Sequence, residues 1–294
     1  MPPEIKIIAV IGAGTMGRGV AYAAAFGGYT TILEDLSPKM LEESLRWIAQ
    51  TFSEGVLRGK VDAKSRDAAA TLISTAVSVP DAIRDADLII EAVPEEMEVK
   101  MELFTIFDKF AKPGAIFASN TSSLSISDMA ELTVSRDRCI GMHFFNPVPK
   151  MKLLELVKTP LTSEATVSAC AEVGRRMGKE VVLVRESPGF ITTRVNALIG
   201  NEAFAMLEAG IASAQDIDKA LKLGLNHPMG PFELVDLVGL DVRLSILEYL
   251  HQTLGEKYRP NSLLKKYVHE GRLGRKTGRG VYDYPTQETT SEKV

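Results

Sequence analysis

The sequence predicts an α/β protein, with a doubly wound, mostly parallel sheet followed by a smaller all-α domain. Short β-branched runs alternate with helical stretches over residues 1–186, and strands spaced in this way by helices form parallel sheets. A glycine-rich turn directly follows the first strand. After residue 191 helical spacing replaces strand patterns. The domain boundary is therefore predicted near Ser187, with residues 1–186 in the first domain and 187–294 in the second.

The opening of the chain, residues 5–35, has the order strand, glycine turn, helix, strand and acid. Gly12 permits the tight turn, Gly14 lets a pyrophosphate approach the backbone, and Gly17 lets the helix lie close to the strand. The N-terminus of the helix supplies free N–H groups and a positive dipole end to phosphates. The predicted cofactor-binding turn consists of Gly12, Ala13, Gly14, Thr15, Met16 and Gly17.

Asp35 ends the second strand at the distance from Gly14 that dinucleotide-binding units of the Rossmann type use. A carboxylate at this position accepts hydrogen bonds from the adenosine ribose and repels a 2′-phosphate. No arginine follows at once to neutralise such a phosphate, because the next residues are Leu36 and Ser37. The predicted cofactor is NAD rather than NADP. The alternative is a βαβ turn with a structural role only.

The other elements follow from spacing and from capping residues. Ser37 and Pro38 predict a helix start, and that helix should reach about Arg58. The polar stretch 59–66 is expected to be an exposed connection between helices. Further strands are expected at 73–79, 88–94, 115–118, 139–147, 152–157 and 180–184, with helices at 95–110, 163–177, 197–207, 214–223 and 240–254.

Net charge, the length of apolar runs and the positions of the cysteines exclude several classes of protein. A net charge of −4 does not favour binding to nucleic acid. No apolar run approaches the roughly 20 residues of a membrane-spanning helix, and the first strand begins too early for a signal peptide. Cys139 and Cys170 lie outside metal-binding patterns, so no metal site is predicted and both are expected to be core residues. These features predict a soluble, cytoplasmic protein.

Two strand ends carry the residues best suited to chemistry. A polar cluster at 119–123 follows one strand, and ligands bind beyond the carboxyl ends of strands in such sheets. His143 ends the next strand and is the candidate general base. Glu155, in the following apolar segment, is the candidate partner that fixes the orientation of the ring. Without such a partner, a hydrogen-bonded core histidine is the alternative.

Several motifs together resemble the L-3-hydroxyacyl-CoA dehydrogenase family, and its short-chain 3-hydroxybutyryl-CoA branch is most similar in length. The resemblance covers most of the chain and implies NAD-dependent oxidation of an acyl-CoA substrate in fatty acid and butanoate metabolism. The motifs are Gly12–Gly17, Asn-Thr-Ser-Ser-Leu at 120–124, Gly-Met-His-Phe-Phe-Asn-Pro at 141–147, Ser-Pro-Gly-Phe at 187–190, His-Pro-Met-Gly-Pro at 227–231 and Lys-Thr-Gly at 276–278.

The resemblance also implies roles for individual residues. His143 matches the base that takes the 3-hydroxyl proton, Glu155 its partner, and Ser122 a serine that binds the substrate near the 3-oxygen. Ser44 matches a contact of coenzyme A. The residues that match cofactor contacts are Glu95, Lys100, Asn146 and Lys276. Read without the family, Glu95, Lys100 and Ser44 would be helix-start or surface residues.

Two positions depart from the family. Thr193 stands where an asparagine commonly contacts the substrate, and a hydroxyl has less reach than an amide. Thr51 stands where a lysine commonly meets coenzyme A. Cations for the phosphates would then come from elsewhere, with Arg58, Lys60 and Lys64 as candidates.

The family also implies a homodimer built through the all-α domain, which is expected to close the site as well. Two alternative functions remain open. One is a related NAD-dependent hydroxy-acid or sugar-acid dehydrogenase that uses no coenzyme A thioester, and the other is a non-catalytic NAD-binding protein.

Overall fold

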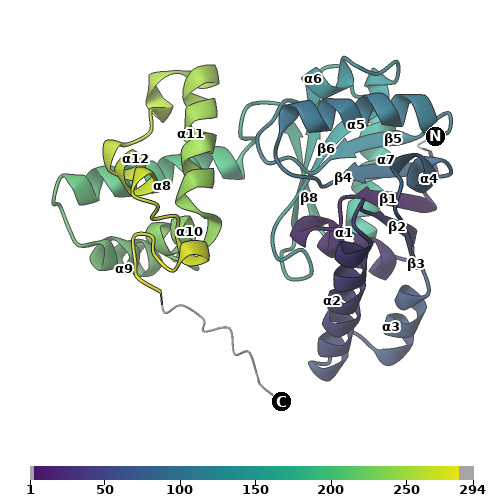
Figure 1. The fold of residues 1–294 in the computed structure, drawn as a ribbon, viewed down its shortest axis with the longest axis horizontal. Coiled ribbons are helices and arrows are strands. Elements are labelled where there is room, and N and C mark those ends of the chain that lie inside the picture. The colour runs from purple at the N-terminus through teal and green to yellow at the C-terminus, as the bar shows by residue number, and fades with distance from the viewer. Residues whose placement is uncertain (1–2, 285–294) are drawn as a thin grey trace. The chain divides into compact units, whose positions relative to one another are not determined.

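The computed structural model describes residues 3–284, which form two compact units, the first ending at Phe190 and the second beginning at Ile191. Figure 1 shows a sheet flanked by helices in the first unit and helices in the second. The division lies between Phe190 and Ile191, whereas the sequence places it near Ser187. Within residues 3–284, no helix combines the length and apolar content that a membrane crossing needs.

The first unit contains an eight-stranded sheet with the order β3-β2-β1-β4-β5-β6-β7-β8. Neighbouring strands from β3 to β6 are parallel, β7 runs antiparallel to β6, and β8 is parallel to β7. This topology confirms the predicted doubly wound, mostly parallel sheet. The strands are β1 (Ile7–Ile11), β2 (Thr30–Glu34), β3 (Ile73–Ala76), β4 (Leu88–Glu91), β5 (Ile116–Ser119), β6 (Cys139–Phe144), β7 (Leu153–Lys158) and β8 (Glu180–Arg185).

Helices cover both faces of the central part of the sheet, and this explains why strands such as β1, β4 and β6 are buried apolar runs. Ile8 and Val10 of β1 share a core with α1, α2 and α7, while Ala9 and Ile11 share the opposite core with α4, α5 and α6. Cys139 and Cys170 are both buried, as predicted. The helices are α1 (Thr15–Phe26), α2 (Pro38–Leu57), α4 (Val79–Ile83), α5 (Met97–Phe110), α6 (Ile126–Ala130) and α7 (Glu164–Arg176).

The segment after α2 differs from its prediction. The start of α2 is as expected, because the side chain of Ser37 accepts a hydrogen bond from the N–H of Met40 at 3.3 Å. The stretch 59–66 is not a connection throughout, since α3 (Ala63–Ala70) begins inside it. The Asp62 carboxylate caps α3 by accepting the N–H of Ser65 at 2.9 Å.

The second unit packs five helices around an apolar core that includes Phe204, Phe232 and Leu247. The helices α9 and α11 match their predictions, α8 begins earlier than the predicted residue 197, and α10 and α12 were not predicted. Both are only eight residues long, which is too short for a clear helical period. The helices are α8 (Thr192–Glu208), α9 (Ala214–Gly224), α10 (Pro231–Val238), α11 (Leu240–Leu254) and α12 (Ser262–His269).

Candidate active site

The glycine turn lies between β1 and α1, and its three glycines serve different purposes. Gly12 has a φ of +95°, which favours glycine. A Cβ on Gly17 would lie 1.7 Å from the carbonyl oxygen of Gly12, so the helix needs a glycine there to pack. A Cβ on Gly14 would meet no protein atom within 4 Å. Backbone conformation therefore explains Gly12 and close packing explains Gly17, whereas the open space at Gly14 fits the approach of a pyrophosphate.

Two side chains hold Ala13 in this turn. The N–H of Ala13 donates to Oδ2 of Asp35 at 3.0 Å, and Oδ1 of Asp35 accepts the N–H of Ser37 at 2.9 Å. The carbonyl oxygen of Ala13 accepts the hydroxyl of Ser44 at 2.6 Å. Each Asp35 oxygen has a second lone pair for a ribose hydroxyl. Ser44 is fully buried, so its predicted contact with coenzyme A does not fit this placement, and its hydroxyl supports the turn instead.

Glu34 precedes Asp35 and was not singled out in the sequence. Its side chain is buried, and Oε1 has no hydrogen-bond partner among the described residues. Burial, reinforced by the negative charge of Asp35, raises the pKa of Glu34 to about 7. A titratable carboxyl therefore lies beside the dinucleotide-binding turn. The one available sign was its charge at the end of a strand with no other charged residue.

His143 and Glu155 are directly opposite each other on the antiparallel strands β6 and β7. Nδ1 of His143 lies 2.8 Å from Oε2 of Glu155, and both side chains are buried. With Nδ1–H donating to the carboxylate, Nε2 carries the lone pair. No hydrogen bond to Nε2 occurs within residues 3–284. The ring also packs against Phe145 and Phe190, with centroids 4.4 and 5.7 Å away. The pair can hold one tautomer and take up a proton.

Ser122 lies just beyond β5, where Glu95 holds its backbone. Oε1 of Glu95 accepts the N–H of Ser122 at 2.9 Å and the hydroxyl of Thr121 at 2.5 Å. Nζ of Lys100 is 3.3 Å from Oε2 of Glu95 and 2.7 Å from Oε1 of Glu91. The side chain of Lys100 is only 1% exposed. Polar contacts thus connect the predicted site residues Ser122, Glu95 and Lys100, but Lys100 itself is buried behind Glu95.

Asn120 connects the strand end of β5 to that of β6. Its Oδ1 accepts the N–H of Phe144, the residue after His143, at 2.9 Å. The sequence placed Asn120 in a polar cluster without a role of its own. Asn146, a predicted cofactor contact, is exposed in the loop after β6. The ends of two neighbouring strands are therefore tied together where the candidate base lies.

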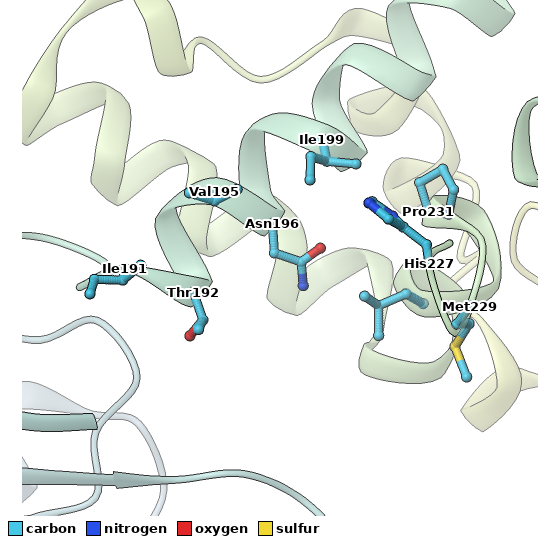
Figure 2. Close-up of a pocket in the computed structure, with 9 residues that line it drawn as sticks. Ile191, Thr192, Val195, Asn196, Ile199, His227, Met229 and Pro231 are labelled. Atoms are coloured by element: carbon cyan, nitrogen blue, oxygen red, sulfur yellow. The ribbon is translucent and has the colours of Figure 1, made fainter. Parts of the chain in front are cut away.

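The remaining predicted residues belong to the second unit. Thr193 is in the first turn of α8 and is partly exposed. Nζ of Lys276 lies 2.7 Å from Oδ2 of Asp241. A mostly apolar cavity of about 330 Å³ lies beside α8, and Figure 2 shows Asn196 projecting from that helix and His227 from the loop before α10. Its lining residues are Ile191, Thr192, Val195, Asn196, Ile199, His227, Met229, Pro231 and Leu234.

A second cavity, of about 470 Å³, belongs to the first unit and is rich in cations. Arg58 and Lys60 line it together with Thr51, and Lys64 does not. Oε2 of Glu54 lies 3.6 Å from the guanidinium of Arg58. The other basic residues in its wall are Lys150, Lys152 and Lys179. Groups of three or more histidine, cysteine, aspartate or glutamate residues that could hold a metal are absent from residues 3–284.

Comparison with known proteins extends over nearly the whole chain. Residues 7–187 match the NAD-binding domain of 3-hydroxyacyl-CoA dehydrogenase, and residues 189–284 match its C-terminal domain. A probable 3-hydroxybutyryl-CoA dehydrogenase of Bacillus subtilis is 44% identical over 98% of this chain and 100% of its own. The human mitochondrial hydroxyacyl-coenzyme A dehydrogenase is 42% identical, covering 95% of this chain and 91% of its own.

A solved structure is also similar to this chain over nearly its whole length. The (S)-3-hydroxybutyryl-CoA dehydrogenase of Ralstonia eutropha has 39% sequence identity and a TM-score of 0.92, over 96% of this chain and 99% of that chain.

Proposed function

Since this chain belongs to the 3-hydroxyacyl-CoA dehydrogenase family and is an NAD-dependent enzyme of that class, we propose that its substrate carries a short acyl chain. The proposed reaction interconverts (S)-3-hydroxybutyryl-CoA and the 3-oxoacyl-CoA. The names of relatives from Bacillus, Ralstonia and Clostridioides, all 3-hydroxybutyryl-CoA dehydrogenases, support the short chain.

We assign the chemistry to the first unit. When bound, NAD accepts a hydride from C3 of the substrate. His143 takes the 3-hydroxyl proton at Nε2, and Glu155 holds the ring and stabilises the imidazolium. The Ser122 hydroxyl is proposed to hydrogen-bond the 3-oxygen. The turn 12–17 and Asp35 would hold the pyrophosphate and the ribose, with Glu95, Asn146 and Lys276 as further proposed cofactor contacts.

The observation that carries this proposal is the 2.8 Å contact between His143 and Glu155 at the strand end of an NAD-binding domain. The test is His143→Gln, assayed by NADH oxidation with acetoacetyl-CoA. Turnover should fall by about a hundredfold or more, because the general acid–base group is lost. NADH should bind as tightly as before by fluorescence titration. Turnover close to that of the wild-type enzyme would disprove the assignment.

A panel of substrates separates the alternatives. A dehydrogenase of free hydroxy acids or sugar acids would oxidise 3-hydroxybutyrate or a sugar acid as fast as the thioester. A non-catalytic NAD-binding protein would bind NADH and turn over none of them. We expect turnover of coenzyme A thioesters only, at a rate that is highest with acetoacetyl-CoA and decreases as the acyl chain lengthens. A rate that rises with chain length would contradict the short-chain proposal.

We further propose that Arg58 and Lys60 contact phosphates of coenzyme A, since both line the cationic cavity that includes Thr51. The variant Arg58→Gln/Lys60→Gln should raise the KM for acetoacetyl-CoA about tenfold, as expected for two exposed ion pairs. The KM for the N-acetylcysteamine thioester, which has no phosphates, should not change. Lys64→Gln is the control, because Lys64 lies outside the cavity. An equal effect on both thioesters would contradict this proposal.

We also propose that the enzyme is cytoplasmic and forms a homodimer. Several large apolar side chains of the second unit are exposed, which is typical of surfaces that bind another chain. They include Ile211, Leu223, Leu225 and Leu237. Sedimentation should give a mass of twice the 32.0 kDa chain. A monomer at micromolar concentration would contradict the proposal.

A further inference from the structure

A buried lysine joins two carboxylates beneath the end of β5. Nζ of Lys100 lies 2.7 Å from Oε1 of Glu91 and 3.3 Å from Oε2 of Glu95. Lys100 extends from α5, Glu91 is the last residue of β4, and Glu95 lies in the loop between them. We refer to these three residues as the carboxylate–lysine bridge.

The two carboxylates hold consecutive parts of the segment that contains Ser122. Oε2 of Glu91 accepts the hydroxyl of Ser119 at 2.5 Å, at the last residue of β5. Glu95 accepts the hydroxyl of Thr121 and the N–H of Ser122, as described above. The bridge therefore sets the path of the chain from β5 to Ser122 at both ends.

Stability alone does not explain this arrangement. Glu91 and Lys100 are almost completely removed from solvent, and a buried ion pair is often no more stabilising than apolar residues of similar volume. Loss of one partner, in contrast, leaves a buried charge that must move or find another partner. Such a pair is better suited to fixing one geometry than to raising the free energy of unfolding.

The same segment is connected to the candidate base. Asn120 lies between the residues that the two carboxylates hold, and its Oδ1 accepts the N–H of Phe144 beside His143. A shift of the segment would therefore change the distance between the Ser122 hydroxyl and Nε2 of His143. Misplacement by about 1 Å is enough to lower a rate by about a hundredfold.

We propose that Glu91 is a positioning residue, which places Ser122 relative to His143 both directly, by holding Ser119, and through Lys100 and Glu95. Lys100, accordingly, acts on the site through Glu95 rather than by touching the cofactor. This inference rests on the proposed function, because it assumes that Ser122 and His143 act on one substrate.

The test is a double-mutant cycle of Glu91→Gln and Ser122→Ala, with kcat measured at saturating NADH and acetoacetyl-CoA. Glu91→Gln alone should lower kcat between about tenfold and a hundredfold, while the Kd for NADH stays within about twofold. In the Ser122→Ala background the same substitution should have little further effect. An undiminished effect in that background would overturn the inference, since Glu91 would then act independently of Ser122.

Asp87→Asn is the matched control. Asp87 precedes β4 at its other end and pairs with Lys112 at 2.6 Å, so its loss should lower the Tm without lowering kcat. If Glu91→Gln does not fold, Glu91→Gln/Lys100→Met removes both buried charges. We expect this variant to be folded and to keep the low kcat.

Two outcomes separate this inference from the proposed function. A normal kcat in a variant with a lowered Tm would overturn the inference alone. Absence of turnover by the wild-type protein would overturn the proposed function, and the inference with it.

Discussion

Glu34→Gln tests whether a buried carboxyl beside the dinucleotide-binding turn makes stability depend on pH. Burial and Asp35 raise the pKa of Glu34 from 4.5 to about 7. The neutral form is therefore favoured in the folded protein, and the unfolded chain loses this proton at lower pH. Stability from this group is present below pH 4.5 and is lost as pH rises towards 7. Between these two limits, the contribution of Glu34 to the free energy of unfolding changes by about 3 kcal/mol.

The glutamine variant cannot ionise and should lack this dependence. Urea unfolding of both proteins between pH 5 and pH 8.5 gives the comparison, with Trp47 fluorescence as the signal. Trp47 is the only tryptophan of the sequence and lies on α2, so it reports on the unit that contains Glu34. The advantage of the variant should grow by about 2–3 kcal/mol over this range. A constant difference between the two proteins would refute the reasoning.

Three further substitutions test the site. Glu155→Gln removes the charge opposite His143, and kcat should fall about tenfold to a hundredfold, the value of a hydrogen bond to a charged group; an unchanged kcat would contradict this role. Asp35→Asn should weaken NADH binding by about tenfold or more and improve the relative affinity for NADPH, both measured by fluorescence titration. If the ratio of the two affinities were the same in the variant and the wild-type protein, Asp35 would have no part in the choice between NADH and NADPH. Gly17→Ala places a Cβ 1.7 Å from the oxygen of Gly12 and should destabilise the protein by about 1–3 kcal/mol, measured by urea unfolding; wild-type stability would show that the turn can adapt.

Local signals were strong where a residue acts through its immediate neighbours. The glycine spacing predicts the turn, because Gly12 needs a positive φ and Gly17 a close contact within the same unit. Ser37 and Pro38 predict the start of α2 for the same reason. The capping of α3 by Asp62 was missed, since a single cap in a polar stretch is a weak signal.

Contacts between residues far apart in the chain were harder to predict from the sequence. The sequence suggested His143 and Glu155 as partners, but only the antiparallel register of β6 and β7 puts them opposite each other. Ser44 and Lys100 looked like surface or ligand-binding residues on their helices. Both are buried, because burial depends on which face of a helix meets the sheet and on what fills the space between them.

The sequence by itself determined the fold class, the NAD cofactor and the family, since these depend on periodicity and on short motifs of contiguous residues. Tertiary structure alone decided that Glu34 is buried without a partner for Oε1 among the described residues, that Glu91 and Glu95 share Lys100, and that Asn120 connects two strand ends. Those features join residues from different strands and loops, and their geometry follows from the order of strands in the sheet rather than from spacing along the chain.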